Sequence, residues 1–135
     1  MKIVSFSAEE TARIGYNMGK AAKPGDIYCL SGTLGAGKTV FSQGFARGLG
    51  YTGRVTSPTF TIMNTYEGGR LNLYHFDLYR LENETDLESI GYEEYFYSDG
   101  CCLVEWPERM PHMDNAQLVE IQTFPDEPDK REIGW

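Results

Sequence analysis

Residues 27–49 read IYCLSGTLGAGKTVFSQGFARGL, and this stretch decides the fold. It begins with a short apolar run, Ile27–Leu30, which is typical of a buried strand. A glycine-rich loop follows, and then a predicted helix from about residue 38 to 49 in which Phe41, Phe45 and Leu49 share one face. The order of strand, glycine-rich loop and helix predicts an α/β protein whose loop binds an anion.

The loop matches the phosphate-binding pattern G-x-x-x-x-G-K-[ST] at Gly32–Thr39. Its glycines let successive backbone N–H groups converge on phosphate oxygens, and the N-terminus of the following helix faces the same anion. In this pattern Lys38 reaches the β- and γ-phosphates of a nucleotide, and the Thr39 hydroxyl binds Mg²⁺. The sequence has no Asn-Lys-x-Asp segment, with which GTPases usually read guanine, so ATP is favoured.

Two acidic residues are candidates for a further oxygen ligand of Mg²⁺. Asp77 follows the β-prone segment Leu71–Phe76, and Glu105 follows the apolar run Cys101–Val104. Acids at the ends of buried strands hold the metal or orient the attacking water in phosphate-loop enzymes. Spacing alone does not assign the two roles between Asp77 and Glu105.

The remaining elements are predicted from patterns around this core. Ser7 and Glu10 form a capping box for a first helix, whose inner face would carry Ile14, Met18 and either Ala21 or Ala22, and which ends at Pro24-Gly25-Asp26. Further along the chain we expect a hairpin of strands 60–66 and 71–76. It is followed by one or two short helices within 83–97, with Leu87, Ile90 and Tyr95 facing inward. A strand near 118–123 and a weakly specified tail over 125–135 complete the chain.

Charge is unevenly distributed along the chain. The 135 residues suit a single domain, 1–135, with a net charge of −8. Residues 1–60 hold seven Lys and Arg against three Asp and Glu, whereas residues 61–135 hold five against seventeen. The stretch 82–105 holds eight acids and no base, which indicates either a solvated helical face or a docking surface for a basic partner. Such acidity argues against a protein that wraps nucleic-acid backbones by charge alone.

The cysteine pattern indicates a reducing compartment. The three cysteines are an odd number and two of them, Cys101 and Cys102, are adjacent, so they are not a disulfide framework. Packing in buried strands is favoured over zinc binding, because the cysteines lack C-x-x-C spacing. No apolar run is long enough to span a membrane, and no signal peptide is visible, so we expect a cytoplasmic protein. His75 is interpreted as a structural histidine rather than a catalytic base.

Four segments make the sequence resemble the TsaE (YjeE) family, small bacterial ATPases of tRNA threonylcarbamoyladenosine modification. They are Leu34–Thr39, Ser57–Phe60, His75–Leu81 and Val104–Glu108. The first is generic, whereas the other three in this order are specific. The resemblance extends from about Thr11 to the strand near Leu118.

The resemblance implies a three-layer phosphate-loop NTPase fold with a mixed sheet, to which the hairpin contributes antiparallel pairing. It implies binding of ATP and Mg²⁺ and slow ATP hydrolysis by the isolated protein. It further implies partners, TsaD and TsaB, which transfer threonylcarbamoyl to adenosine 37 of tRNA, so that tRNA is engaged only indirectly. The ATP cycle would reset or support that complex.

The resemblance also assigns roles to residues by position. Catalytic roles fall on Lys38, Asp77 and Glu105, and metal binding falls on Thr39, Asp77 and Glu105. A loop that behaves like a switch region matches 57–59. Nucleotide binding falls on Thr11, Leu34, Gly35, Ala36, Gly37, Lys38, Thr39, Val40, Trp106, Arg109 and Arg131. For Arg109 and Arg80 a structural salt bridge to the acidic segment is an equal alternative to a phosphate contact.

Two other functions fit the phosphate loop. A small-molecule kinase would need an acceptor pocket with several arginines, but Arg70, Arg80 and Arg109 do not cluster in the sequence. A non-hydrolytic switch would use ATP binding alone to create a docking surface. A metabolite-dependent burst of ADP would favour the kinase, whereas function that survives loss of hydrolysis with retained binding would favour the switch.

Overall fold

The computed structural model describes residues 1–135 except 34, 59–60, 83, 112 and 114. Five elements form the first half of the chain, β1 (Lys2–Ser5), α1 (Ala8–Ala21), β2 (Ile27–Ser31), α2 (Lys38–Gly48) and β3 (Met63–Tyr66). The second half contains β4 (Leu73–Asp77), α3 (Glu84–Ser89), α4 (Tyr92–Phe96), β5 (Cys101–Glu105), the 3₁₀ turn η1 (Pro107–Arg109), β6 (Ala116–Thr123) and β7 (Arg131–Gly134).

The strands of the described residues form one mixed seven-stranded sheet in the order β1-β7-β6-β2-β5-β4-β3. The four central strands, β6, β2, β5 and β4, are parallel to one another. Antiparallel pairs flank them, β3 against β4 on one side, and β7 against β6 and β1 on the other. The predicted mixed α/β sheet and its hairpin are therefore confirmed, and the carboxyl ends of the central strands meet at one edge.

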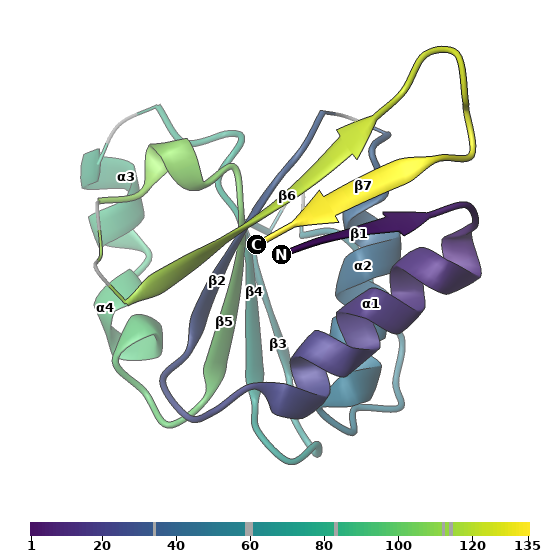
Figure 1. Ribbon diagram of the computed structural model, residues 1–135. Helices are drawn as coiled ribbons and strands as arrows, with labels where there is room; N and C mark the ends of the chain where they lie inside the picture. Colours follow the sequence, from purple (N-terminus) through teal and green to yellow (C-terminus); the bar gives the residue numbers. More distant parts are fainter. Residues whose placement is uncertain (34, 59–60, 83, 112, 114) are drawn as a thin grey trace.

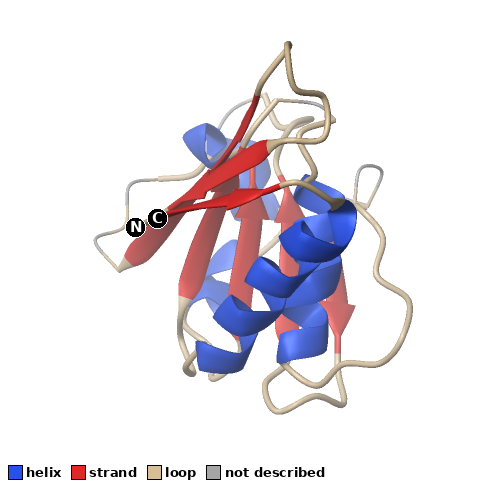
Figure 2. Ribbon diagram, turned by 45° about the vertical axis from the view of Figure 1, so that its right-hand side comes forward, coloured by secondary structure: helices blue, strands red, loops and turns tan. Residues whose placement is uncertain are grey.

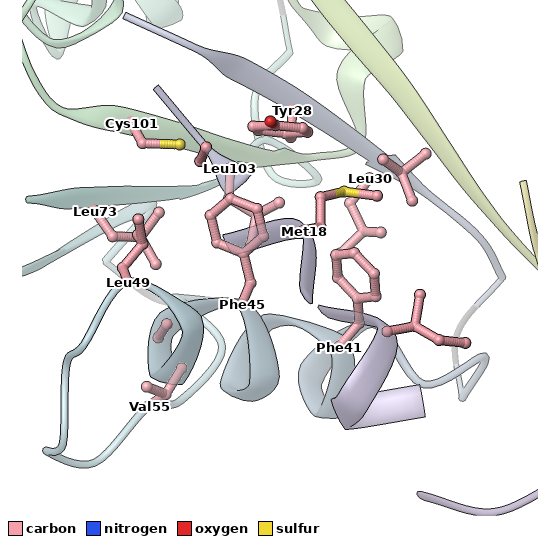
Figure 3. Packing of buried hydrophobic residues seen from close by; sticks show 14 of the residues in the cluster. Met18, Tyr28, Leu30, Phe41, Phe45, Leu49, Val55, Leu73, Cys101 and Leu103 are labelled. Carbon is pink, nitrogen blue, oxygen red and sulfur yellow. The ribbon is translucent and has the colours of Figure 1, made fainter. Parts of the chain in front are cut away.

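Helices cover the sheet on both faces (Figures 1 and 2). The long helices α1 and α2 lie side by side on one face, and the short helices α3 and α4 lie on the other. Each side has its own buried apolar cluster, with Phe41, Phe45 and Leu103 in the first and Phe76 and Phe96 in the second. Figure 3 shows Phe41 and Phe45 rising from α2 toward the central strands. Because β2 and β5 are covered on both faces, they read as continuous apolar runs.

The first helix has the predicted Ser7 cap, whereas Glu10 bonds one residue earlier than a capping box requires. The Ser7 hydroxyl accepts the Glu10 N–H at 3.1 Å, and the Glu10 carboxylate accepts the Phe6 N–H at 2.8 Å. Ile14, Met18 and Ala22 are buried, whereas Ala21 is exposed, which settles the alternative left by the sequence. Among the acidic helices, Leu87 is fully buried and Ile90 and Tyr95 pack at the edge of the second cluster.

The two long helices approach each other closely enough for their backbones to touch. A Cβ added at Gly44 of α2 would lie 2.0 Å from the Ala12 carbonyl oxygen of α1, and one at Gly15 of α1 would lie 2.3 Å from the Phe41 carbonyl oxygen of α2. Real Cβ atoms do not make such contacts, so only glycine fits. Gly19 and Gly48 repeat this approach one turn further along each helix.

The sequence interpretation missed the two strands at one edge of the sheet. It began the chain with a helix and left 125–135 as a tail, but Lys2–Ser5 and Arg131–Gly134 are strands paired with each other. Only Ser5 of β1 and Ile133 of β7 are buried, so neither strand carries a clear apolar pattern. These strands form because backbone groups near the two ends of the chain pair with each other. Met1 and Trp135 therefore lie together (Figure 1).

The cysteines are placed as predicted. Cys29, Cys101 and Cys102 are free thiols buried in β2 and β5. Burial raises the pKa of the Cys29 thiol to about 11 and that of the Cys102 thiol to about 12. In the part of the chain that the structure describes, no helix combines the length and apolar character needed to cross a bilayer.

Candidate functional site

The glycine-rich loop connects the end of β2 to the start of α2. Gly37 is the N-cap of α2 with φ 105°, and Gly35 has φ 79°, so both occupy a region that L-residues rarely adopt. Ala36 is fully buried between them, and its N–H bonds to the Thr33 carbonyl at 3.0 Å. Leu34 lies outside the described residues. The conformation directs the N-terminus of an eleven-residue helix at the loop, which suits an anion.

Lys38 is held inside the loop by two contacts. Its ammonium group donates to the Gly32 carbonyl at 2.8 Å and lies 4.4 Å from the centre of the Trp106 ring. The side chain is 7% exposed, which is low for a lysine. Thr39 and Val40 follow in the first turn of α2, with Thr39 exposed and Val40 half-buried.

Trp106 follows Glu105 in a strained conformation. Its φ is 60° and its ψ 56°, a left-handed geometry that costs about 1–3 kcal/mol for a non-glycine residue. The ring packs on Tyr79, with 4.8 Å between the centroids, and also contacts the Lys38 ammonium group. The turn at Trp106 thus brings the segment after β5 to the glycine-rich loop.

The two predicted acids lie side by side at the ends of β4 and β5. Asp77 pairs in register with Glu105, and Glu105 pairs on its other side with Leu30, two residues before Gly32. Both side chains are buried, Asp77 at 7% and Glu105 at 3% exposure. Buried carboxylates need partners. The structure therefore brings both acids to the strand end from which the loop departs.

Asp77 connects to the loop that precedes β3. Its carboxylate accepts the Tyr79 N–H at 3.1 Å and faces the Ser57 hydroxyl at 3.5 Å, while its own N–H bonds to the Ile62 carbonyl at 2.8 Å. Ile62 has φ 69°, which is unusual for a β-branched residue. Of the switch-like segment predicted at 57–59, residue 59 lies outside the described residues.

The donor set fits Mg²⁺ bound together with phosphates. Within the described ranges, no group of three or more His, Cys, Asp and Glu side chains is placed to hold a metal alone. Mg²⁺ in nucleotide sites uses one or two carboxylates, a hydroxyl, phosphate oxygens and water. Asp77, Glu105 and Thr39 offer that set, so the residues present suit the ion.

Glu105 has a histidine partner that the sequence interpretation missed. The Nε2 atom of His75 lies 2.7 Å from Oε2 of Glu105, and His75 is fully buried. His75 is thus a buried residue with a hydrogen-bond partner in the core, in line with the structural role predicted for it. That partner is a candidate catalytic acid. The only sequence signal was its position in β4, two residues before Asp77.

Arg131 and Thr11 lie against the loop. The Arg131 guanidinium donates to the carbonyls of Ala36 at 2.8 Å and Gly35 at 3.4 Å. Thr11 is buried, shares a 2.7 Å hydrogen bond with the Ser5 hydroxyl, and has its methyl group 3.9 Å from the position a Cβ would take on Gly37. Both predicted residues are therefore beside the loop, with Arg131 bonded to its carbonyls.

Arg109 contacts the backbone just before the acidic segment. It is exposed in η1, and its guanidinium donates to the Leu81 carbonyl, which is a hydrogen bond rather than the salt bridge given as the alternative. This contact ties the turn after β5 to the turn after β4.

A groove of about 540 Å³ opens beside the loop. Gly32, Lys38 and Trp106 line it, together with Glu120 of β6 and Glu132 of β7. The site therefore contains the loop lysine, an aromatic wall and open volume.

Comparison with known proteins gives consistent relatives. The family model "Threonylcarbamoyl adenosine biosynthesis protein TsaE" matches residues 5–133. Proteins named tRNA threonylcarbamoyladenosine biosynthesis protein TsaE are similar to the chain. The Bacillus subtilis protein is 45% identical, and the match covers 100% of this chain and 84% of the relative's length. The Treponema pallidum protein is 47% identical, and the match covers 82% of this chain and 81% of the relative's length. The crystal structure of Bacillus subtilis YdiB superposes with a TM-score of 0.81 at 42% identity, covering 98% of this chain and 82% of its own. The chain belongs to the TsaE family.

Proposed function

We propose that the chain is a Mg²⁺-dependent ATPase with a phosphate-loop NTPase fold that acts in threonylcarbamoyladenosine modification of tRNA. The observation that carries the proposal is the register at the strand ends, where Asp77 pairs with Glu105 and Glu105 pairs with Leu30, next to the loop of Lys38. Membership of the TsaE family supports the pathway. The motif and its strand–loop–helix context support ATP as the ligand.

The residues of the loop would bind and orient the phosphates. Backbone N–H groups and the N-terminus of α2 face the anion, and Lys38 would exchange its contact with the Gly32 carbonyl for phosphate oxygens. Thr39 and one of the two acids would hold Mg²⁺, which supplies positive charge to the phosphates when bound. The other acid would accept a hydrogen bond from the attacking water. Trp106 would close the site from one side.

The partners are proposed from the family. TsaD and TsaB would transfer the threonylcarbamoyl group to adenosine 37, and this chain would supply the ATP cycle that supports their complex. tRNA would be reached through that complex.

A reconstituted assay of tRNA modification tests the proposed function. With TsaB, TsaD and their substrates present, we expect multiple turnovers only when this chain and ATP are added. The control is the Lys38→Ala chain, which keeps the fold but loses phosphate stabilisation. Undiminished multiple-turnover modification without the chain would contradict the proposal.

The contact between Asp77 and Ser57 favours a second candidate, a nucleotide switch without required hydrolysis. Through this contact, occupancy of the site can be transmitted to the loop before β3. Glu105→Ala and Lys38→Ala separate the two functions. We expect both variants to fail in modification. A Glu105→Ala chain that binds ATP, does not hydrolyse it and still supports modification would establish the switch.

A further inference from the structure

A buried histidine contacts one oxygen of Glu105. His75 lies in the interior of β4, in register with Leu103 of β5 and Asn64 of β3. Its Nε2 atom is 2.7 Å from Glu105 Oε2, and the two side chains are 1% and 4% exposed. This contact therefore joins two adjacent strands beneath the proposed nucleotide site.

The strand geometry explains why the contact forms. Side chains alternate between the faces of a strand, so His75 and Asp77 share a face of β4, and Leu103 and Glu105 share a face of β5. Because Asp77 is opposite Glu105, His75 is the diagonal neighbour of Glu105. Diagonal neighbours are within reach of long side chains. His75 can thus bond to Glu105 from below while Asp77 stands beside it.

The hydrogen-bond partners show what the histidine provides. With Glu105 as a carboxylate, which only accepts, the hydrogen of this bond would be carried by Nε2 of His75. Nδ1 is buried and has no hydrogen-bond partner in the part of the chain that the structure describes. The Tyr66 ring, at 6.4 Å between centroids, lies near the imidazole. A buried nitrogen without a hydrogen-bond partner is costly, so packing alone would favour an apolar residue at this position.

We propose that His75 is a positioning residue that fixes the Glu105 carboxylate by engaging Oε2. The second oxygen, Oε1, is then the one presented to the site. The inference rests on the proposed function for the role of Glu105, but the contact itself does not. Hydrogen-bond partners that orient a ligating carboxylate typically change activity or metal affinity by about 10–100-fold.

Substitutions of His75 test the role by kinetics. His75→Phe keeps a ring but removes the donor, and we expect kcat for ATP to fall by about 10-fold or more with KM changed little. His75→Gln places an amide donor at a reach similar to Nε2 and should recover most of the activity, whereas His75→Asn is too short and should not. Leu73→Ala is the matched control, because it opens the core on the same face of β4 without touching Glu105.

A double-mutant cycle separates positioning from a structural role. In the Glu105→Ala background, His75→Phe should lower the rate no further, because the group it positions is gone. The proposal would be overturned if His75→Phe lowered the rate by the same factor in both backgrounds. It would also be overturned if His75→Gln were no more active than His75→Phe. Circular dichroism of each variant shows whether the fold is kept.

A spectroscopic measurement tests the contact independently of activity. The chain has two histidines, so the spectrum of His75→Phe assigns the ring N–H signals in ¹H–¹⁵N NMR. We expect a slowly exchanging Nε2–H proton of His75 that disappears in Glu105→Ala and persists in Lys38→Ala. Absence of this proton in the unsubstituted chain overturns the positioning role. If it is present but the chain does not hydrolyse ATP, the proposed function fails while the contact stands.

Discussion

The proposed chemistry of the site depends on a few side chains whose present contacts would have to change for a nucleotide to bind. Lys38 is the clearest of them, since its ammonium group is bonded to Gly32 and lies over Trp106. A phosphate group would compete for both contacts. Trp106, whose backbone is strained, lies at the position where this exchange of contacts would occur.

This exchange predicts a change in the fluorescence of Trp106. Trp135→Phe leaves Trp106 as the only tryptophan, because the chain has two. In that background Lys38→Met should alter the emission without nucleotide, since it removes the cation over the ring, and because Lys38 is buried the lost contact should cost about 2 kcal/mol. MgATP should shift the emission of the Lys38 protein in the same direction. Lys20→Met, on the exposed face of α1, is the control. Identical emission of Lys38→Met and its parent would contradict the arrangement.

The buried thiols predict loss of stability at alkaline pH. Burial raises the pKa of Cys29 from 9.0 to about 11 and that of Cys102 to about 12, and it also raises the pKa of Cys101. The unfolded chain therefore releases these protons at lower pH than the folded one. The contribution of the protonated thiols to the free energy of unfolding should be fully present below pH 9. It should be lost progressively as pH rises toward 11 and 12. Urea unfolding between pH 7 and 11 checks this, and a constant free energy of unfolding would be inconsistent with it.

At the scale of elements, the packing of α1 on α2 depends on glycine. Gly44→Ala would place a methyl group 2.0 Å from the Ala12 carbonyl oxygen before relaxation. We expect separation of the helices and a loss of about 1–3 kcal/mol of stability. Because α2 carries the loop at its N-terminus, ATP affinity should fall as well. Chemical unfolding measures the first effect. Arg13→Ala, exposed on α1, should stay within about 0.5 kcal/mol of the unsubstituted protein, and a similarly mild Gly44→Ala would refute the close contact.

The elements also show what the sequence allowed us to predict. The strand–loop–helix unit and β5 follow local patterns of apolar residues, so they were predicted with nearly correct bounds. The hairpin was also predicted, but its first strand begins at Met63 rather than at residue 60, which lies outside the described residues. Strands β1 and β7 depend on pairing between residues at opposite ends of the chain, and local patterns carry no information about it.

The same distinction applies to the site. Lys38, Asp77 and Glu105 were found from motifs and strand ends. The contact of His75 with Glu105 depends on register across two strands, and that of Arg131 with the loop depends on β7. A helix cap is local, so Ser7 was placed correctly.

At the scale of the molecule, the acidic segment lies on the side opposite α1 and α2, over α3 and α4 (Figure 1). Glu88, Glu93 and Glu94 are exposed there. As a docking surface for a basic partner, this segment would promote association by charge complementarity, whereas a solvated face would not.

Charge reversal distinguishes these two interpretations. Glu88→Lys, Glu93→Lys and Glu94→Lys together should weaken coupling to TsaB–TsaD about 10-fold or more at low salt, with ATP binding unchanged, if the surface docks a partner. Binding titrations with TsaB–TsaD and with ATP measure the two effects. Unchanged coupling would leave the segment a solvated face, and equal loss of both would indicate a damaged fold.

We propose above that Glu105, held beside the loop of Lys38, serves ATP hydrolysis. The most direct measurement is phosphate release from MgATP in the presence of TsaB–TsaD, comparing the unsubstituted chain with Glu105→Ala at saturating ATP. We predict a rate lower by at least ~10² for Glu105→Ala, with ATP still bound. Equal rates of phosphate release for the two chains would contradict this role of Glu105.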